Sequence, residues 1–318
     1  MQKSGVIINL GSGRGSGKGA ALAAALKIHV NVEVNVLSIF AELNPALAQL
    51  AAAQVTDLFI SSGDGTIQAV VTALAETNLF NKIPKLCILP HGTTNLTAID
   101  LGFKRRSISA QAEFIANPQV TTTVLRHTIR ILNARGEGPR HGFSFGAGAA
   151  ARATRLTQTD FNDQGRKGQL AALRVLAGAV GQALFTKPDP TDLKRLDRPC
   201  NITAEMEGKT VCTGAQLMMI ATTLEKQFFN TKPFWGGKNG PIRFSAFAYP
   251  PPNLLRWMLP IMYGGENRKL PPSAISLSGE SFNITCAEPY VMDGEFFSGP
   301  VSGPLQVEAG PAFEFITA

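Results

Sequence analysis

The chain has 318 residues, 44% of them hydrophobic, and its mean hydropathy of +0.06 excludes a disordered protein and allows one large domain or two of ordinary size. The net charge of +7 favours anionic partners such as nucleotides, nucleic acid or acidic lipid. The densest basic cluster is only Lys104, Arg105 and Arg106, and no nucleic-acid-binding signature accompanies it, so we expect no nucleic-acid partner.

The cysteines and the apolar runs bear on where the protein works. None of the four cysteines is spaced as C-x-x-C, which favours reduced, buried thiols in a cytosolic protein. The four histidines are scattered, so no zinc site is suggested. No apolar run approaches the roughly 18 residues that a spanning helix needs. We therefore expect a cytoplasmic protein, with peripheral membrane association and a homodimer left open.

The first part of the chain alternates strand-like and helix-like runs. Strands are expected at residues 6–10, 32–37, 58–61 and 86–89, and helices at 20–28, 44–53, 67–75, from 95 onward and at 107–116. This alternation predicts an α/β domain with a parallel, doubly wound sheet.

The pattern changes near Pro118. Strand-like runs follow at residues 121–133, 142–145, 201–207, 210–221, 274–278, 282–286 and 305–308, with one helical insert at 168–185. Turn residues between such runs favour an antiparallel arrangement. We therefore expect two domains, 1–120 and a β-rich 121–318, with a return of the C-terminus to the first domain left open.

The stretch Ser61-Ser62-Gly63-Asp64-Gly65-Thr66 follows the apolar run 58–60 directly and precedes an expected helix. Ligands of open α/β sheets bind at the carboxyl ends of strands, and the start of a helix offers free N–H groups to a phosphate. By itself this motif is also compatible with an ordinary strand-to-helix turn.

Two further loops follow expected strands in the same half of the chain. Residues 11–19 are a glycine-rich loop with Arg14 and Lys18, but their spacing fits neither a P-loop nor a dinucleotide fingerprint. Such a loop can still wrap phosphate with its backbone N–H groups, although a plain linker stays possible. Residues 90–95 read Pro-His-Gly-Thr-Thr-Asn, and His91 is more often incidental than catalytic in such a loop.

A pair of carboxylates lies late in the chain, at Asp293 and Glu295 on either side of Gly294. Such a pair can accept a proton from a hydroxyl or hold a metal. Asp-Gly is also a common hairpin turn, and alone this second interpretation is the stronger one.

Together, residues 63–66, 90–95 and 293–295 resemble, in order and spacing, the motifs of the diacylglycerol kinase catalytic-domain family, which includes bacterial lipid kinases and sphingosine kinases. Asn9-Leu10-Gly11-Ser12-Gly13 is similar to its first motif, with Leu10 in place of proline. The resemblance covers nearly the whole chain. It implies an N-terminal α/β nucleotide domain, a C-terminal β-sandwich and an active site between them.

The resemblance implies ATP and Mg²⁺ as cofactors and a lipid at a membrane surface as acceptor. The nucleotide would contact Asn9, Ser12, Gly13, Ser62, Gly63, Asp64, Gly65, Thr66, Gly92, Thr93, Thr94 and Asn95. Asp64 would organise Mg²⁺, and Asp293 or Glu295 would take the proton of the attacking hydroxyl. Which of the two is the base stays open.

Three positions depart from the family pattern. Ser62 stands for a glycine, as it does in sphingosine kinases, Leu96 for an aspartate, and Gly146 for the aspartate of a Gly-Phe-Gly-Phe-Asp-Ala motif. The last departure bears on the acceptor more than on the phosphate donor. Two alternatives therefore remain, namely an NAD kinase-like enzyme, which shares Gly-Asp-Gly-Thr but lacks the 90–95 pattern, and a non-catalytic lipid- or nucleotide-binding protein.

The acceptor is inferred from apolar segments. These are residues 168–185, the aromatic pairs at 228–229 and 234–235, and the run 249–259 with Tyr249, Arg256 and Trp257. Such a segment suits a bilayer interface, although a core helix and its lid would have the same composition.

Overall fold

The computed structural model describes residues 2–15, 17–92, 95–104, 107–119, 122–134, 138–164, 178, 192, 195–227, 230–251 and 253–317. The chain forms two compact units, Met1–Thr128 with Pro311–Ala318, and Ile129–Gly310. The first break therefore follows residue 128, where the sequence suggested residue 120, and the last residues belong to the first unit. Strands β5 (Thr123–Ile131) and β16 (Leu305–Ile316) each begin in one unit and end in the other.

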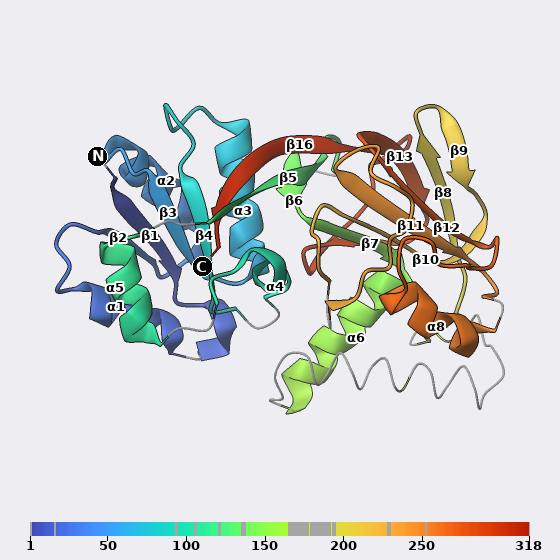
Figure 1. Cartoon of the computed structure of the whole chain (residues 1–318), viewed down its shortest axis with the longest axis horizontal. Helices are drawn as coiled ribbons and strands as arrows, with labels where there is room; N and C mark the ends of the chain where they lie inside the picture. The colour runs from blue at the N-terminus through green and yellow to red at the C-terminus, as the bar shows by residue number, and fades with distance from the viewer. Residues whose placement is uncertain are drawn as a thin grey trace. The chain divides into compact units, whose positions relative to one another are not determined.

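The first unit is built on a parallel sheet (Figure 1). Its strands are β1 (Ser4–Asn9), β2 (Glu33–Leu37), β3 (Asp57–Ser62) and β4 (Lys85–Pro90), and the end of β16 joins them in the order β16-β4-β3-β1-β2. All of these neighbours run parallel. The parallel α/β domain expected from the alternation of runs is confirmed.

Helices cover both faces of this sheet. On one face, α1 (Lys18–Leu26) and α5 (Ile108–Ala116) pack on a core that includes Val6, Ile8 and Phe59. Gly5 of β1 faces the opposite side of the sheet. A Cβ built on Gly5 would lie 2.7 Å from the side chain of Leu50 on α2 (Leu43–Ala52), which covers that side. The remaining helices of this unit are the 3-10 turns η1 (Ser12–Gly15) and η2 (Phe40–Glu42), and α3 (Asp64–Glu76) and α4 (Leu96–Leu101).

The second unit is an antiparallel β-structure. Its strands are β6 (Arg140–Gly142), β7 (Ser144–Gly148), β8 (Cys200–Met206), β9 (Lys209–Cys212), β10 (Ala215–Thr222), β11 (Ile242–Ala248), β12 (Ala274–Gly279), β13 (Ser281–Cys286), β14 (Tyr290–Met292) and β15 (Glu295–Phe297). Phe244 of β11 packs against Phe282 of β13 at 5.6 Å between ring centroids, although these strands are not paired. Two layers thus face each other across one apolar core, which confirms the mostly antiparallel β-rich domain.

Turns divide two of the expected strands. The run 210–221 becomes β9 and β10 because Gly214 adopts a φ of +85°, which few residues other than glycine tolerate. The run 142–145 is divided between β6 and β7. Strands β11, β14 and β15 were not expected from the sequence, nor was helix α6 (Ala149–Gln164).

The expected helical insert 168–185 lies outside the described residues except for Gly178, and the pair 228–229 lies outside them too. In the run 249–259, helix α8 spans Leu254–Tyr263. No helix in the described part of the chain is long and apolar enough to span a bilayer.

Candidate functional site

Asp64 joins two loops at the carboxyl end of the parallel sheet. It is the first residue of α3 and is only 7% exposed. Its Oδ2 accepts a hydrogen bond from the backbone N–H of Leu96, and its Oδ1 accepts one from that of Thr97, both at 3.0 Å. These donors lie in the first turn of α4, where backbone N–H groups have no partner within the helix. Burial raises the pKa of Asp64, and the two amide donors oppose that rise.

The loop after β1 is tied to the same turn. Asn9 at the end of β1 donates from Nδ2 to Thr66 Oγ1 at 2.9 Å, and its Oδ1 accepts the N–H of Gly11 at 2.9 Å. Asn9 therefore orients the first loop and the Thr66 hydroxyl together.

Two glycines allow the β3 and β4 loops to touch. A Cβ built on Gly92 would lie 2.4 Å from the Cα of Gly63, so only glycine fits there without a backbone shift. A Cβ on Gly63 would lie 3.1 Å from Ser12 Oγ, which brings the first loop to the same place. Asn95 closes the β4 loop, because its Oδ1 accepts the N–H of Gly92 and its Nδ2 donates to the Gly92 carbonyl, both at 2.8 Å.

The structure therefore brings together Asn9, Ser12, Gly63, Asp64, Thr66, Gly92 and Asn95 at the carboxyl ends of β1, β3 and β4. Gly13 lies in η1 with a φ of +66°, and Gly65 lies in the first turn of α3. Ser62 is fully buried, and its Oγ has no hydrogen-bond partner among the described residues. Thr93 and Thr94 lie outside those residues.

His91 has a structural environment. It is 4% exposed, and its Nδ1 lies 2.8 Å from Ser61 Oγ. Burial, with a smaller contribution from the charge of Lys18, lowers the pKa of His91 to about 4. The ring is therefore neutral near pH 7, and the Ser61–His91 pair is a contact that could not be expected from the sequence.

Asp293 belongs to the second unit, where it forms the turn between β14 and β15. Asp293 and Gly294 have φ values of +48° and +88°, and Met292 pairs with Glu295 across the turn, as in a two-residue hairpin. The Asp293 carboxylate is buried and accepts hydrogen bonds from the backbone N–H groups of Phe143 and Ser144, the shorter of them 2.9 Å to Ser144. The hairpin thus holds a carboxylate against β7, a contact that only the fold could reveal.

These motifs coincide with a match to a known family. The family model described as diacylglycerol kinase catalytic domain matches residues 3–126, which contain all three loops. The match covers residues of the first unit alone.

Solved structures match the fold over both units. A diacylglycerol kinase from Bacillus anthracis str. Sterne is 13% identical with a TM-score of 0.61, and the match covers 99% of this chain and 96% of that one. Another structure from the same organism, of a protein assigned as a diacylglycerol kinase, is 14% identical with a TM-score of 0.65, covering 100% and 97%. At such identities the likeness shows the fold alone. No curated protein matches the chain.

Gly146 of the second unit stands where the resembled family has an aspartate, and there is little room for a side chain at this position. A Cβ built on Gly146 would lie 2.9 Å from the Cβ of Ala150 and 3.2 Å from Val291. An aspartate at position 146 would therefore require a shift of the start of α6. Glu295, in contrast to Asp293, is exposed on β15.

Two further features of the site are the position of Leu96 and the capacity of the site to bind Mg²⁺. Leu96 is buried at the start of α4, and its N–H serves Asp64. Among the described residues, no three His, Cys, Asp or Glu side chains gather in a way that could hold a metal. Mg²⁺ that binds together with phosphate groups needs only one or two protein carboxylates, and Asp64 is one such carboxylate at these loops.

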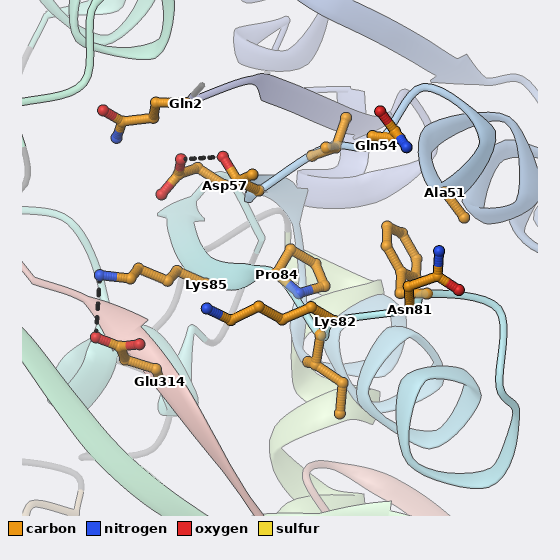
Figure 2. A pocket seen from close by; sticks show the side chains of 13 residues that line it. Gln2, Ala51, Gln54, Asp57, Asn81, Lys82, Pro84, Lys85 and Glu314 are labelled. Atoms are coloured by element: carbon orange, nitrogen blue, oxygen red, sulfur yellow. Dashed lines mark hydrogen bonds and ion pairs between the residues drawn. The ribbon is translucent and has the colours of Figure 1, made fainter.

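A separate pocket of about 560 Å³ lies in the first unit, away from these loops. Figure 2 shows it at the amino ends of β3 and β4, with Asp57, Lys82 and the Lys85–Glu314 ion pair in its wall. It includes none of the residues that the sequence assigned to a site.

Proposed function

We propose that the protein is an ATP-dependent lipid kinase, which transfers the γ-phosphate of ATP to a hydroxyl of a lipid such as diacylglycerol or a sphingoid base. The observation that carries this proposal is the convergence of three small-residue loops at the carboxyl end of the parallel sheet, within residues that match the diacylglycerol kinase catalytic domain.

The phosphates of ATP would bind along these loops. Residues 12–13 and 63–66 offer backbone N–H groups and hydroxyls without bulky side chains, and the start of α3 adds the positive end of a helix dipole. Asn9, Ser62 and Gly92 would contribute from the adjoining strand ends, and Thr93, Thr94 and Asn95 would complete the nucleotide site. Phosphoryl transfer depends mainly on such positioning and on charge stabilisation.

Asp64 has a double role in this proposal. Its hydrogen bonds to Leu96 and Thr97 hold the β4 loop against the β3 turn. Its negative charge lies where the water shell of a nucleotide-bound Mg²⁺ would be attracted. The ion itself would supply neutralisation of the phosphate charge.

Asp293 is the carboxylate that we propose as general base. It is fixed by the N–H groups of Phe143 and Ser144, whereas Glu295 is exposed. A fixed carboxylate loses no side-chain entropy when it receives the proton of an acceptor hydroxyl. A well-placed general base increases the reaction rate by roughly 10²–10⁴-fold.

A lipid acceptor is supported by the apolar surface of the second unit. On α8, Leu259 is 62% exposed and Tyr263 is 52% exposed, while the Arg256 guanidinium lies 5.0 Å from the Trp257 ring centroid. Aromatic, basic and apolar side chains on one short helix suit the interface of an anionic bilayer.

ADP release would test the proposal. The full chain, with ATP and Mg²⁺, is given detergent-dispersed diacylglycerol, monoacylglycerol, a sphingoid base, ceramide, or NAD, and ADP is measured by a coupled assay. We expect ADP release well above the acceptor-free rate with at least one lipid and not with NAD. Stimulation by NAD alone would support the NAD kinase-like alternative, and no stimulation by any acceptor would support a non-catalytic binding protein.

A further inference from the structure

Two thiols of the second unit lie against each other. Cys200 Sγ and Cys286 Sγ are 3.6 Å apart, on residues separated by 86 positions in the chain. Cys200 is the first residue of β8 and Cys286 the last of β13. Because Ile202 is paired with Cys286 in this antiparallel ladder, Cys200 and Cys286 are diagonal neighbours on one face.

The position at strand ends matters for what the pair can do. A disulfide requires the sulfurs to approach to about 2.05 Å, so they must come closer by about 1.5 Å. Cys286 can make most of this shift because it ends β13, whereas Cys200 is also paired with Gln216 of β10. The last bond of this ladder, from Ala287 N–H to the Asn201 carbonyl, is already long at 3.3 Å.

The two thiols differ in exposure and in charge environment. Cys200 is 3% exposed, whereas Cys286 is partly exposed. The contact with the Cys200 thiol is the largest influence on the pKa of Cys286 and lowers it, the charge of Arg152 has a smaller effect in the same direction, and burial and the charge of Glu288 oppose both. Arg152 is itself held in place by its ion pair with Glu288 at 3.1 Å. Cys286 is thus the more accessible sulfur, and Cys200 is its buried partner.

We propose that Cys200 and Cys286 form a peroxide-oxidisable dithiol that closes reversibly to an intramolecular disulfide. The inference does not rest on the proposed kinase activity. The other two cysteines, Cys87 and Cys212, are both buried.

The chemistry balances with hydrogen peroxide as the oxidant. The Cys286 thiolate attacks one peroxide oxygen and forms an S–O bond as the O–O bond breaks, which leaves a sulfenic acid and hydroxide, the latter taking a proton to become water. The Cys200 sulfur then attacks the sulfenic sulfur. The S–O bond breaks, a second water leaves with the Cys200 proton, and the disulfide forms. Overall, two thiols are oxidised and one peroxide is reduced to two waters.

Peroxide titration of the full-length protein tests this proposal. After brief exposure to dilute hydrogen peroxide and removal of the excess, thiols are counted in denaturant and the protein is digested without reductant. We expect the count to fall from four to two, the intact mass to fall by about 2 Da, and one linked peptide to join Cys200 to Cys286. Dithiothreitol should restore all four thiols.

Single variants separate the two roles. In Cys200→Ser, the sulfenic acid on Cys286 should persist and be trapped by dimedone, whereas in Cys286→Ser, Cys200 should stay reduced. Cys212→Ser is the matched control and should form the bridge as the wild type does. Four free thiols after exposure, a bridge that uses another cysteine, or oxidation of Cys286 to sulfinic acid without a bridge would overturn the proposal. The wild-type peptide map decides the matter even where a variant fails to fold.

Discussion

At the scale of single residues, Asp64 connects the β3 turn to the N-terminus of α4. Asparagine has the same shape but only one acceptor oxygen, and its NH₂ group would face a backbone N–H. We expect Asp64→Asn to lower the free energy of unfolding by about 1–3 kcal/mol and to lower kcat/KM at least ~10-fold. Urea denaturation and steady-state kinetics measure the two effects. Glu266→Gln, on a side chain that is 79% exposed, is the control, and an Asp64→Asn protein with unchanged stability and activity would contradict the role assigned to Asp64.

Asp293 and Glu295 are distinguished by their surroundings. Asp293 is held by two backbone amides, while Glu295 is exposed. We expect Asp293→Asn to lower kcat by roughly 10²–10⁴-fold and Glu295→Gln to change it by less than about threefold. Turnover with saturating ATP and lipid is the measurement. The reverse order of effects would assign the base to Glu295.

His91 predicts a pH dependence of stability. Its pKa in the folded protein is about 4, below the ordinary value of 6.5, so the unfolded chain binds more protons between these values. The contribution of the neutral His91 ring to the free energy of unfolding is therefore fully present above pH 6.5. It is lost as the pH falls toward 4, where the free energy of unfolding is lower by about 3 kcal/mol. Denaturation of wild type and His91→Gln across this range should show a shallower pH dependence in the variant. An imidazole NMR titration of wild type with a midpoint near 6.5 would refute the prediction.

At the scale of elements, the contact between the β3 and β4 loops depends on Gly92. A methyl group there would lie 2.4 Å from the Gly63 Cα, so Gly92→Ala must push the loops apart. We expect a loss of about 1–3 kcal/mol in stability and weaker ATP binding, measured by denaturation and calorimetry. Gly265→Ala is the matched control, because no atom lies within 4 Å of its built Cβ. Equal ATP affinity in the two variants would contradict the proposed nucleotide site.

The elements near the β1, β3 and β4 loops could be predicted because each signal is local. Strand β3 is an apolar run that stops at glycine, and α3 begins one residue later. The partners of Asp64 and Asp293 could not be predicted, because they are backbone N–H groups 32 and 150 residues away. Backbone donors leave no trace in side-chain chemistry. Strands β14 and β15, of three residues each, are too short for an alternating pattern to stand out.

At the scale of the whole molecule, the family model matches only part of the chain, whereas the structural similarity extends over nearly all of it. The family model matches residues 3–126, whereas the similarity to the Bacillus anthracis structures extends over both units at 13–14% identity. The loops of the first unit thus carry the sequence signal, and the second unit keeps the fold with its own residues, such as Gly146. The acceptor therefore has to be determined on this protein.

The most direct test of the account is to follow the γ-phosphate of labelled ATP into its product. The protein is incubated with γ-labelled ATP, Mg²⁺ and one mixture of diacylglycerol, a sphingoid base and NAD, and the products are separated and identified by mass spectrometry, with Asp293→Asn as the control. We expect a single labelled phosphate on a lipid hydroxyl in the wild type and at least ~100-fold less label on lipid in the variant. Label on NAD, or only in inorganic phosphate, would contradict it.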